Sequence, residues 1–230
     1  MADVGANYQN IIGRIREAAV TAGRDPSEIK LLAAAKSQSI EAMQAVMAAG
    51  VKLIGENYVQ EAQAKKRAIR EPAEWHMIGH LQRNKAKAAV ELFDVIESLD
   101  SAALARELDK EGARRGKIVR AFIEVNLSGE ANKTGIAKHQ VKSLLEDAAA
   151  LAHIVIAGLM TVPPFREDPE EVRPYFRELR QLRTELNDLR LANVALTDLS
   201  MGMTHDYLVA IEEGATIVRI GTALFGPRSV

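Results

Sequence analysis

The chain of 230 residues alternates short apolar runs with amphipathic segments, and this alternation constrains the fold more than any other feature. The apolar runs predict eight buried strands, at Leu31–Lys36, Lys52–Gly55, Trp75–Ile78, Phe93–Glu97, Val119–Asn126, Ile154–Met160, Val194–Leu199 and Thr216–Ile220. The segments with helical periodicity are Ile40–Ala49, Val59–Ile69, Asn84–Glu91, Ala102–Arg115, Lys138–Ala150, Pro169–Leu191 and Asp206–Glu213. Strands that are apolar almost throughout and alternate with helices are typical of a parallel sheet covered by helices.

The number of strand–helix units decides between two parallel architectures. Five or six units would form an open doubly wound sheet, whereas eight units close into a (β/α)8 barrel. We therefore predict a single-domain (β/α)8 TIM barrel over residues 1–230, with the open sheet as the alternative if one or two weaker runs are not strands. A further helix, predicted over Gln9–Ala22, precedes the first strand and is expected to cover the barrel floor.

Composition and charge narrow the classes of partner. Hydrophobic residues make up 47% and charged residues 27% of the chain, as in soluble globular proteins. The 30 Lys and Arg residues nearly balance the 31 Asp and Glu residues, which argues against nucleic acid or an acidic membrane as the partner. The sequence has no cysteine, no secretory signal and no apolar stretch long enough to span a bilayer. We expect a cytoplasmic monomer that contacts no membrane.

Two basic residues at opposite ends of the chain carry the clearest chemical signal. Lys36 ends the first apolar run, where a partly desolvated amine could condense with a carbonyl. Arg219 lies within the last apolar strand, and in a closed barrel that strand neighbours the first. An amine, a buried cation and the glycine turn that follows predict a site for a phosphorylated aldehyde. The structural alternatives are a lysine that begins a solvated loop and an arginine in an ion pair inside the barrel.

The segments after the last two strands suggest where a phosphate would bind. They read Ser200-Met201-Gly202-Met203-Thr204 and Gly221-Thr222, and barrels often bind phosphate in the loops after strands seven and eight. Gly202 and Gly221 allow the backbone to approach an anion, and Thr222 would open a short helix whose free N–H groups attract it. Ordinary turns have the same composition, so each loop alone is also compatible with no ligand.

His76 and His80 are the one pair with the spacing of metal ligands on a helix. His76, however, lies in a predicted strand, Gly79 interrupts the interval, and no carboxylate follows at a useful spacing. We therefore predict no metal site. His76 either contacts the ligand near the upper end of its strand or is a hydrogen-bonded core histidine.

Six segments in a fixed order carry a family resemblance: Ala35-Lys36, Ile54-Gly55-Glu56-Asn57-Tyr58-Val59-Gln60-Glu61, Trp75-His76-Met77-Ile78-Gly79-His80-Leu81-Gln82-Arg83-Asn84-Lys85, Gly158-Leu159-Met160-Thr161, Ser200-Met201-Gly202-Met203 and Val218-Arg219-Ile220-Gly221-Thr222. Through them the sequence resembles the pyridoxal phosphate homeostasis proteins, relatives of the alanine racemase N-terminal barrel. The resemblance covers the chain nearly from end to end.

The resemblance implies that Lys36 forms a Schiff base with pyridoxal 5′-phosphate (PLP) and that Arg219 faces the pyridine nitrogen. It also implies a phosphate site and a ring pocket around the cofactor. The full set of expected cofactor-binding residues is Lys36, Asn57, His76, Met160, Ser200, Met201, Gly202, Arg219, Gly221 and Thr222. Many relatives carry Lys-Thr-Lys-Pro after the first strand, where this chain has Lys36-Ser37-Gln38-Ser39. The absent second lysine puts any part of position 38 in cofactor transfer in doubt.

Three functions are compatible with such a site. The family implies a non-catalytic protein that holds PLP and passes it to PLP-dependent apoenzymes. The alternative is a PLP-dependent racemase or decarboxylase, and a third possibility is a barrel aldolase that uses Lys36 on a sugar phosphate directly. Racemase relatives add a β domain with a tyrosine acid/base, for which this chain leaves no room. Arg219 also leaves a pyridine nitrogen unprotonated, which weakens the ring as an electron sink. We therefore predict the carrier.

Overall fold

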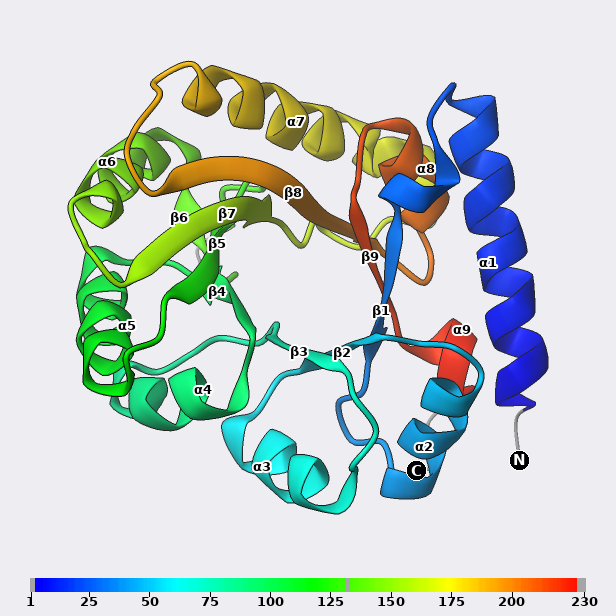
Figure 1. The fold of residues 1–230 in the computed structure, drawn as a ribbon. Coiled ribbons are helices and arrows are strands. Elements are labelled where there is room, and N and C mark those ends of the chain that lie inside the picture. Colours follow the sequence, from blue (N-terminus) through cyan, green and yellow to red (C-terminus); the bar gives the residue numbers. More distant parts are fainter. Residues whose placement is uncertain (1–2, 131–132, 227–230) are drawn as a thin grey trace.

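The computed structural model describes residues 3–130 and 133–226, in which eight parallel strands close into a barrel (Figure 1). The barrel strands, in their order around the ring, are β1 (Lys30–Ala34), β2 (Leu53–Glu56), β3 (Glu74–Met77), β4 (Val95–Leu99), β5 (Val119–Asn126), β7 (Ile154–Met160), β8 (Val194–Met203) and β9 (Ile217–Ile220). Leu31 of β1 pairs with Val218 of β9, which closes the ring. The predicted (β/α)8 barrel is confirmed.

Helices surround this barrel on the outside (Figure 1). They are α1 (Val4–Thr21), α2 (Ile40–Ala48), α3 (Val59–Ala68), α4 (Ala86–Leu92), α5 (Ala102–Arg115), α6 (Lys138–Ala149), α7 (Arg173–Asn187), α8 (Tyr207–Glu212) and α9 (Thr222–Phe225). Single turns of 3-10 helix lie at η1 (Pro26–Glu28), η2 (Arg83–Lys85) and η3 (Pro169–Val172). A two-residue strand, β6 (Ile136–Ala137), pairs with the end of β5 and was not predicted.

The expectation that the N-terminal helix covers the barrel floor is wrong. α1 packs along the side of the barrel against α2, α8 and α9 (Figure 1). The reason is that α8 and α9 are only 6 and 4 residues long and leave a stretch of the barrel wall thinly covered. The apolar face of α1, with Ile11 and Ile15 at its centre, fills that gap. Asn7 Nδ2 also donates a hydrogen bond to Leu224 O of α9 at 3.0 Å.

One strand boundary differs from the prediction in a way that affects the site. β8 continues to Met203, so Ser200–Met203 form the end of a strand and not the predicted loop. The pairing of β8 with β9 shifts register between Ser200 and Met203, and Gly202 within this bulge has a φ of 90°. A Cβ at Gly202 would lie 2.5 Å from Ala210 Cβ, so the glycine permits close packing of the bulge on α8.

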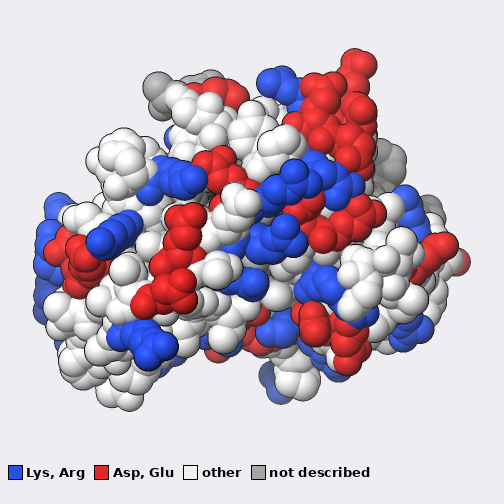
Figure 2. All heavy atoms as spheres, turned by 90° about the horizontal axis from the view of Figure 1, so that it is seen from above, with Lys and Arg blue, Asp and Glu red and all other residues white. Residues whose placement is uncertain are grey.

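The surface shows no excess of one charge on the side that carries α7. Seen from that side, basic and acidic side chains form neighbouring clusters (Figure 2). Glu213, at the end of α8, receives ion pairs from Arg173, Arg177 and Arg180 of α7 at 2.9–3.2 Å. No helix of the described ranges has both the length and the apolarity needed to cross a membrane.

Candidate functional site

Lys36 lies in a sharp turn two residues beyond the end of β1, with its side chain half-buried. The next residue, Ser37, has a φ of 60°. A left-handed backbone of this kind costs a residue with a Cβ about 1–2 kcal/mol. Such a turn persists only where its surroundings hold it, and here the backbone N–H of Ser37 donates to Glu61 Oε2 at 3.0 Å.

A buried ion pair holds the other side of the turn. Lys65 of α3 is 7% exposed, and its Nζ donates to Ala35 O and to Glu56 Oε1, both at 2.7 Å. Burial raises the pKa of Glu56, while the hydrogen bond from Lys65 acts in the opposite direction. The strand end that precedes Lys36 is therefore fixed by side chains of the neighbouring unit. The sequence contained this pattern, a glutamate at the end of one strand and a lysine nine residues later, but we did not assign it a role.

Arg219 projects from β9 towards the inside of the barrel and is 4% exposed. Its Nη1 donates to Ser200 Oγ at 2.7 Å, and its Nη2 donates to Thr161 O at 2.8 Å. Burial lowers the pKa of Arg219, and the charges of Glu97, Glu124 and Asp206 partly offset that effect. The guanidinium is therefore held in one orientation by partners on β8 and at the end of β7.

A chain of hydrogen bonds continues from Arg219 along the barrel interior. Ser200 Oγ donates to Glu97 Oε2 at 2.5 Å. The other oxygen of Glu97 lies 2.5 Å from His76 Nδ1, and His76 Nε2 lies 3.2 Å from Glu74 Oε1. Because carboxylates only accept, both ring nitrogens of His76 donate, which requires the imidazolium form.

The pKa of His76 agrees with this geometry. Burial alone would lower the pKa, but the hydrogen bonds and charges of Glu74 and Glu97 outweigh burial and raise it to about 9. The same contact with His76 lowers the pKa of Glu74. Positive and negative side chains thus alternate from Arg219 through Glu97 and His76 to Glu74.

A hollow of about 420 Å³ opens at the carboxyl ends of the strands, above Arg219. Its lining residues are Ala34, Lys36, Gln38, Asn57, Ile78, Val162, Phe165, Met203, Thr204, His205, Arg219, Gly221, Thr222 and Gly226. Five of the residues singled out from the sequence therefore meet here: Lys36, Asn57, Arg219, Gly221 and Thr222. Lys36 and Arg219 belong to the neighbouring strand ends of β1 and β9, as the barrel geometry predicted.

The other five expected residues do not line this hollow. Ser200 and His76 lie deeper in the barrel, within the hydrogen-bonded chain below Arg219. Met160 belongs to the apolar cluster inside the barrel, together with Leu32 and Phe122. Met201 faces the other way, into the apolar layer between strands and helices, and Gly202 forms the bulge against α8.

Two aromatic rings that the sequence did not single out stand at the mouth of the hollow. Phe165, in the segment between β7 and α7, is 74% exposed. Its ring lies 5.2 Å from that of His205, centroid to centroid, and His205 Nε2 donates to Glu167 O at 2.9 Å. The available signal in the sequence was a phenylalanine directly after two prolines. Only the fold shows that this ring is exposed and that it faces His205.

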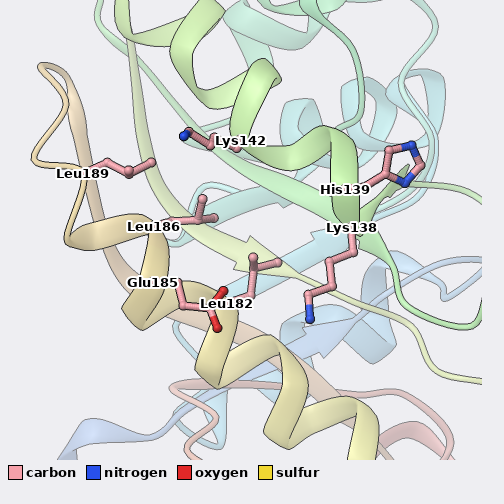
Figure 3. A pocket seen from close by; sticks show the side chains of 7 residues that line it. All are labelled: Lys138, His139, Lys142, Leu182, Glu185, Leu186 and Leu189. Carbon is pink, nitrogen blue, oxygen red and sulfur yellow. The ribbon is translucent and has the colours of Figure 1, made fainter.

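A separate hollow of about 490 Å³ lies on the outside of the barrel between α6 and α7 (Figure 3). Its lining residues are Lys138, His139, Lys142, Leu182, Glu185, Leu186 and Leu189. It contains no strand residue and none of the residues predicted to bind a ligand. In the parts of the chain that the structure describes, no group of three or more metal-ligating side chains could hold a metal ion.

Comparisons with known proteins agree with this geometry. The family model of the alanine racemase N-terminal domain matches residues 7–229. The pyridoxal phosphate homeostasis protein of Aquifex aeolicus is 47% identical over 219 residues, which are 95% of each chain. The structure of PipY of Synechococcus elongatus with PLP bound has 36% identity and a TM-score of 0.82, covering 92% of this chain and 100% of that one.

A more distant likeness concerns the fold alone. An alanine racemase of Clostridium difficile has a TM-score of 0.78 at 12% identity, and the match covers all of this chain but 58% of the racemase. The barrel therefore corresponds to one part of that enzyme. From the family model and the full-length identity to its relatives, the chain belongs to the alanine racemase N-terminal domain family and, within it, to the pyridoxal phosphate homeostasis proteins.

Proposed function

We propose that this chain binds PLP in the hollow around Lys36 and Arg219, and that it holds this cofactor for delivery to other proteins. The observation that carries the proposal is the meeting of an amine and a buried guanidinium in one hollow, although they lie far apart in the sequence. The name of the Aquifex aeolicus relative and the PLP bound to PipY support it.

The donors around the hollow suit each part of the cofactor. PLP carries an aldehyde that condenses reversibly with a lysine amine, which allows a protein to hold it covalently. We assign the half-buried amine of Lys36 to the aldehyde and the apolar side chain of Ile78 to the ring. Gly221 and Thr222, at the turn into α9, are assigned to the phosphate.

Arg219 would determine the electronic state of the bound ring. An arginine donates hydrogen bonds and keeps its proton, so opposite a pyridine nitrogen it favours the unprotonated ring. We propose that Ser200 acts by fixing this guanidinium and does not touch the phosphate, because its hydroxyl is shared between Arg219 and Glu97. His76 in turn would fix Glu97.

A PLP-dependent enzyme is the second candidate, and one observation favours it. His205 lines the same hollow as Lys36, so a second group able to transfer protons is present. Arg219 would weaken the ring as an electron sink, which argues against reactions that depend on a protonated pyridine nitrogen. The ring of His205 also lies against that of Phe165, tilted by 40°, at the mouth of the hollow. We therefore propose the carrier as the main function.

The binding proposal is tested by reduction and mapping. The purified protein with added PLP should absorb in the visible range, and borohydride followed by peptide mass mapping should place the pyridoxyl group on Lys36. The Lys36→Ala variant should lose the absorbance, whereas Lys87→Ala, an exposed lysine on α4, should keep it. A label spread over surface lysines in both variants would contradict the assignment.

Catalysis and delivery need separate measurements. In deuterated water, amino acids incubated with the PLP-loaded protein should exchange their α-hydrogen no faster than with free PLP. Exchange that is lost in both Lys36→Ala and His205→Gln would instead establish an enzyme.

Delivery predicts that the loaded protein reactivates a PLP-dependent apoenzyme in the presence of a trap for free PLP. If no reactivation occurs, the proposed function is reduced to storage of PLP.

A further inference from the structure

A second polar hollow lies at the opposite end of the barrel from Lys36, and the proposed PLP chemistry does not use it. It has a volume of about 530 Å³ and is lined by Arg24, Ser27, Glu28, Lys30, Arg120, Arg183, Thr197, Asp198, Gly214 and Thr216. Lys30 begins β1, Arg120 lies near the start of β5, and Thr216 precedes β9. These positions put the hollow at the amino-terminal ends of the strands. Four of its side chains are cationic and two are carboxylates.

Both carboxylates already have partners. Asp198 is 5% exposed and lies 2.5 Å from Arg120 Nη2 and 3.6 Å from Lys30 Nζ. The hydroxyl of Thr216 also donates to Asp198, at 3.1 Å. Glu28 accepts from both Nε and Nη2 of Arg24. No acidic group of the hollow is therefore left to balance a further cation.

Arg183 is that further cation. It projects from α7 and is only partly exposed, yet its side chain makes no hydrogen bond or ion pair with any residue in the described ranges 3–130 and 133–226. Burial lowers the pKa of Arg183, the charges of Arg24 and Arg180 lower it further, and the charge of Asp198 acts in the opposite direction. A partly buried guanidinium that has no ion-pair partner of its own and lies near two other cations is unfavourable, because the carboxylate of Asp198 is already paired with Arg120 and Lys30. A bound anion would relieve this.

We propose that this hollow binds a small multivalent oxyanion of the phosphate type, with Arg183 as its principal ligand and Lys30 as a second cation. A guanidinium presents paired N–H donors that match phosphate oxygens. The side chain of Lys30 is 45% exposed, and its Nζ lies 3.6 Å from Asp198 Oδ1, which is long for an ion pair. Its amine can therefore reach an anion without breaking a tight pair. Ser27 adds a hydroxyl donor to the same lining. The inference itself does not depend on PLP binding, although its test uses the proposed PLP binding to fill the upper hollow.

The test is a titration of inorganic phosphate into protein that has been treated with PLP and reduced with borohydride. Binding is measured by calorimetry and by the change in the thermal unfolding midpoint. Reduction keeps the upper hollow filled, so phosphate should report on the lower one. We expect one bound phosphate per chain and a rise of the unfolding midpoint with phosphate. Arg183→Gln should weaken binding about tenfold or more, and Lys30→Gln should weaken it less. Arg183→Lys, which keeps the charge but loses the paired donors, should lie in between.

Two controls make the result specific. Lys87→Gln removes one exposed positive charge from α4, far from this lining, and should leave phosphate binding unchanged. Thr222→Ala, at the upper hollow, should also leave it unchanged when it is compared with the wild-type protein at equal occupancy of reduced PLP. A parallel titration with glycerol phosphate distinguishes a monoester from free phosphate as the better ligand. Absence of binding at millimolar phosphate, or binding that Arg183→Gln leaves intact, would overturn the proposal. Loss of binding in Thr222→Ala alone would assign the phosphate to the upper hollow.

Discussion

His76 predicts a specific dependence of stability on pH. Its imidazolium lies between Glu97 and Glu74, with its pKa raised from 6.5 to about 9 in the folded protein. A group whose pKa is raised by folding contributes its stabilisation in full below its unfolded pKa and loses it as pH rises through the folded pKa. The stabilisation should therefore be complete near pH 6 and decline between about pH 6.5 and pH 9.5.

The size of the effect follows from the same shift. Each pKa unit corresponds to 1.36 kcal/mol, so a rise from 6.5 to about 9 gives at most about 3 kcal/mol of unfolding free energy. For a domain whose total stability is about 5–15 kcal/mol, a loss of this size is readily measured.

Urea denaturation at a series of pH values, for the wild-type protein and for His76→Gln, isolates this contribution. The difference in unfolding free energy between the two proteins should shrink steadily as pH rises from 6.5 to 9.5. Nuclear magnetic resonance of the His76 ring should show a titration midpoint near 9. The argument is refuted if the two stability curves stay parallel over this range, or if the ring titrates near its ordinary pKa.

Three further predictions concern the upper hollow, the turn at Lys36 and the assembly. Thr222→Ala should weaken PLP binding by about 1.5–3 kcal/mol, the strength of one charged hydrogen bond, and should leave binding of pyridoxal, which lacks the phosphate, unchanged in a fluorescence titration. Lys65→Met should cost about 3–5 kcal/mol at neutral pH because it leaves Glu56 buried without its cation. Since a neutral Glu56 needs no cation, that loss in urea denaturation should diminish as pH falls, and adding Glu56→Gln should recover part of it. Sedimentation at micromolar concentration should show a monomer with and without PLP, because all the proposed site residues come from one barrel; a dimer whose dissociation releases PLP would contradict this.

The sequence predicted the parts of the molecule that depend on periodicity and order along the chain. Continuous apolar runs located all eight barrel strands, and the closure of the last strand on the first correctly brought Lys36 and Arg219 together. The end of β8 was misplaced because Ser200-Met201-Gly202 has the composition of a turn, whereas a bulge at Gly202 lets the strand continue. The short strand β6 is too brief to show any periodicity.

Contacts between strands could not be predicted in the same way. His76 and Glu97 lie 21 residues apart on adjacent strands, and their hydrogen bond depends on a register that no local pattern specifies. The contact between the rings of Phe165 and His205 likewise depends on the paths of two separate loops. Side chains carried by strand ends could be assigned to the site, but their partners inside the barrel required the three-dimensional structure.

The pairing of β9 with β1 has a consequence for the order of events during synthesis. β9 follows every other barrel strand in the sequence, and it carries Arg219 and leads directly into Gly221 and Thr222. A nascent chain that already exposes Lys36 and its turn still lacks the buried guanidinium of Arg219 and the turn at Gly221 and Thr222 until β9 has left the ribosome. If PLP binds at Lys36 as proposed, the pocket that retains it should therefore form late in translation, when the barrel closes.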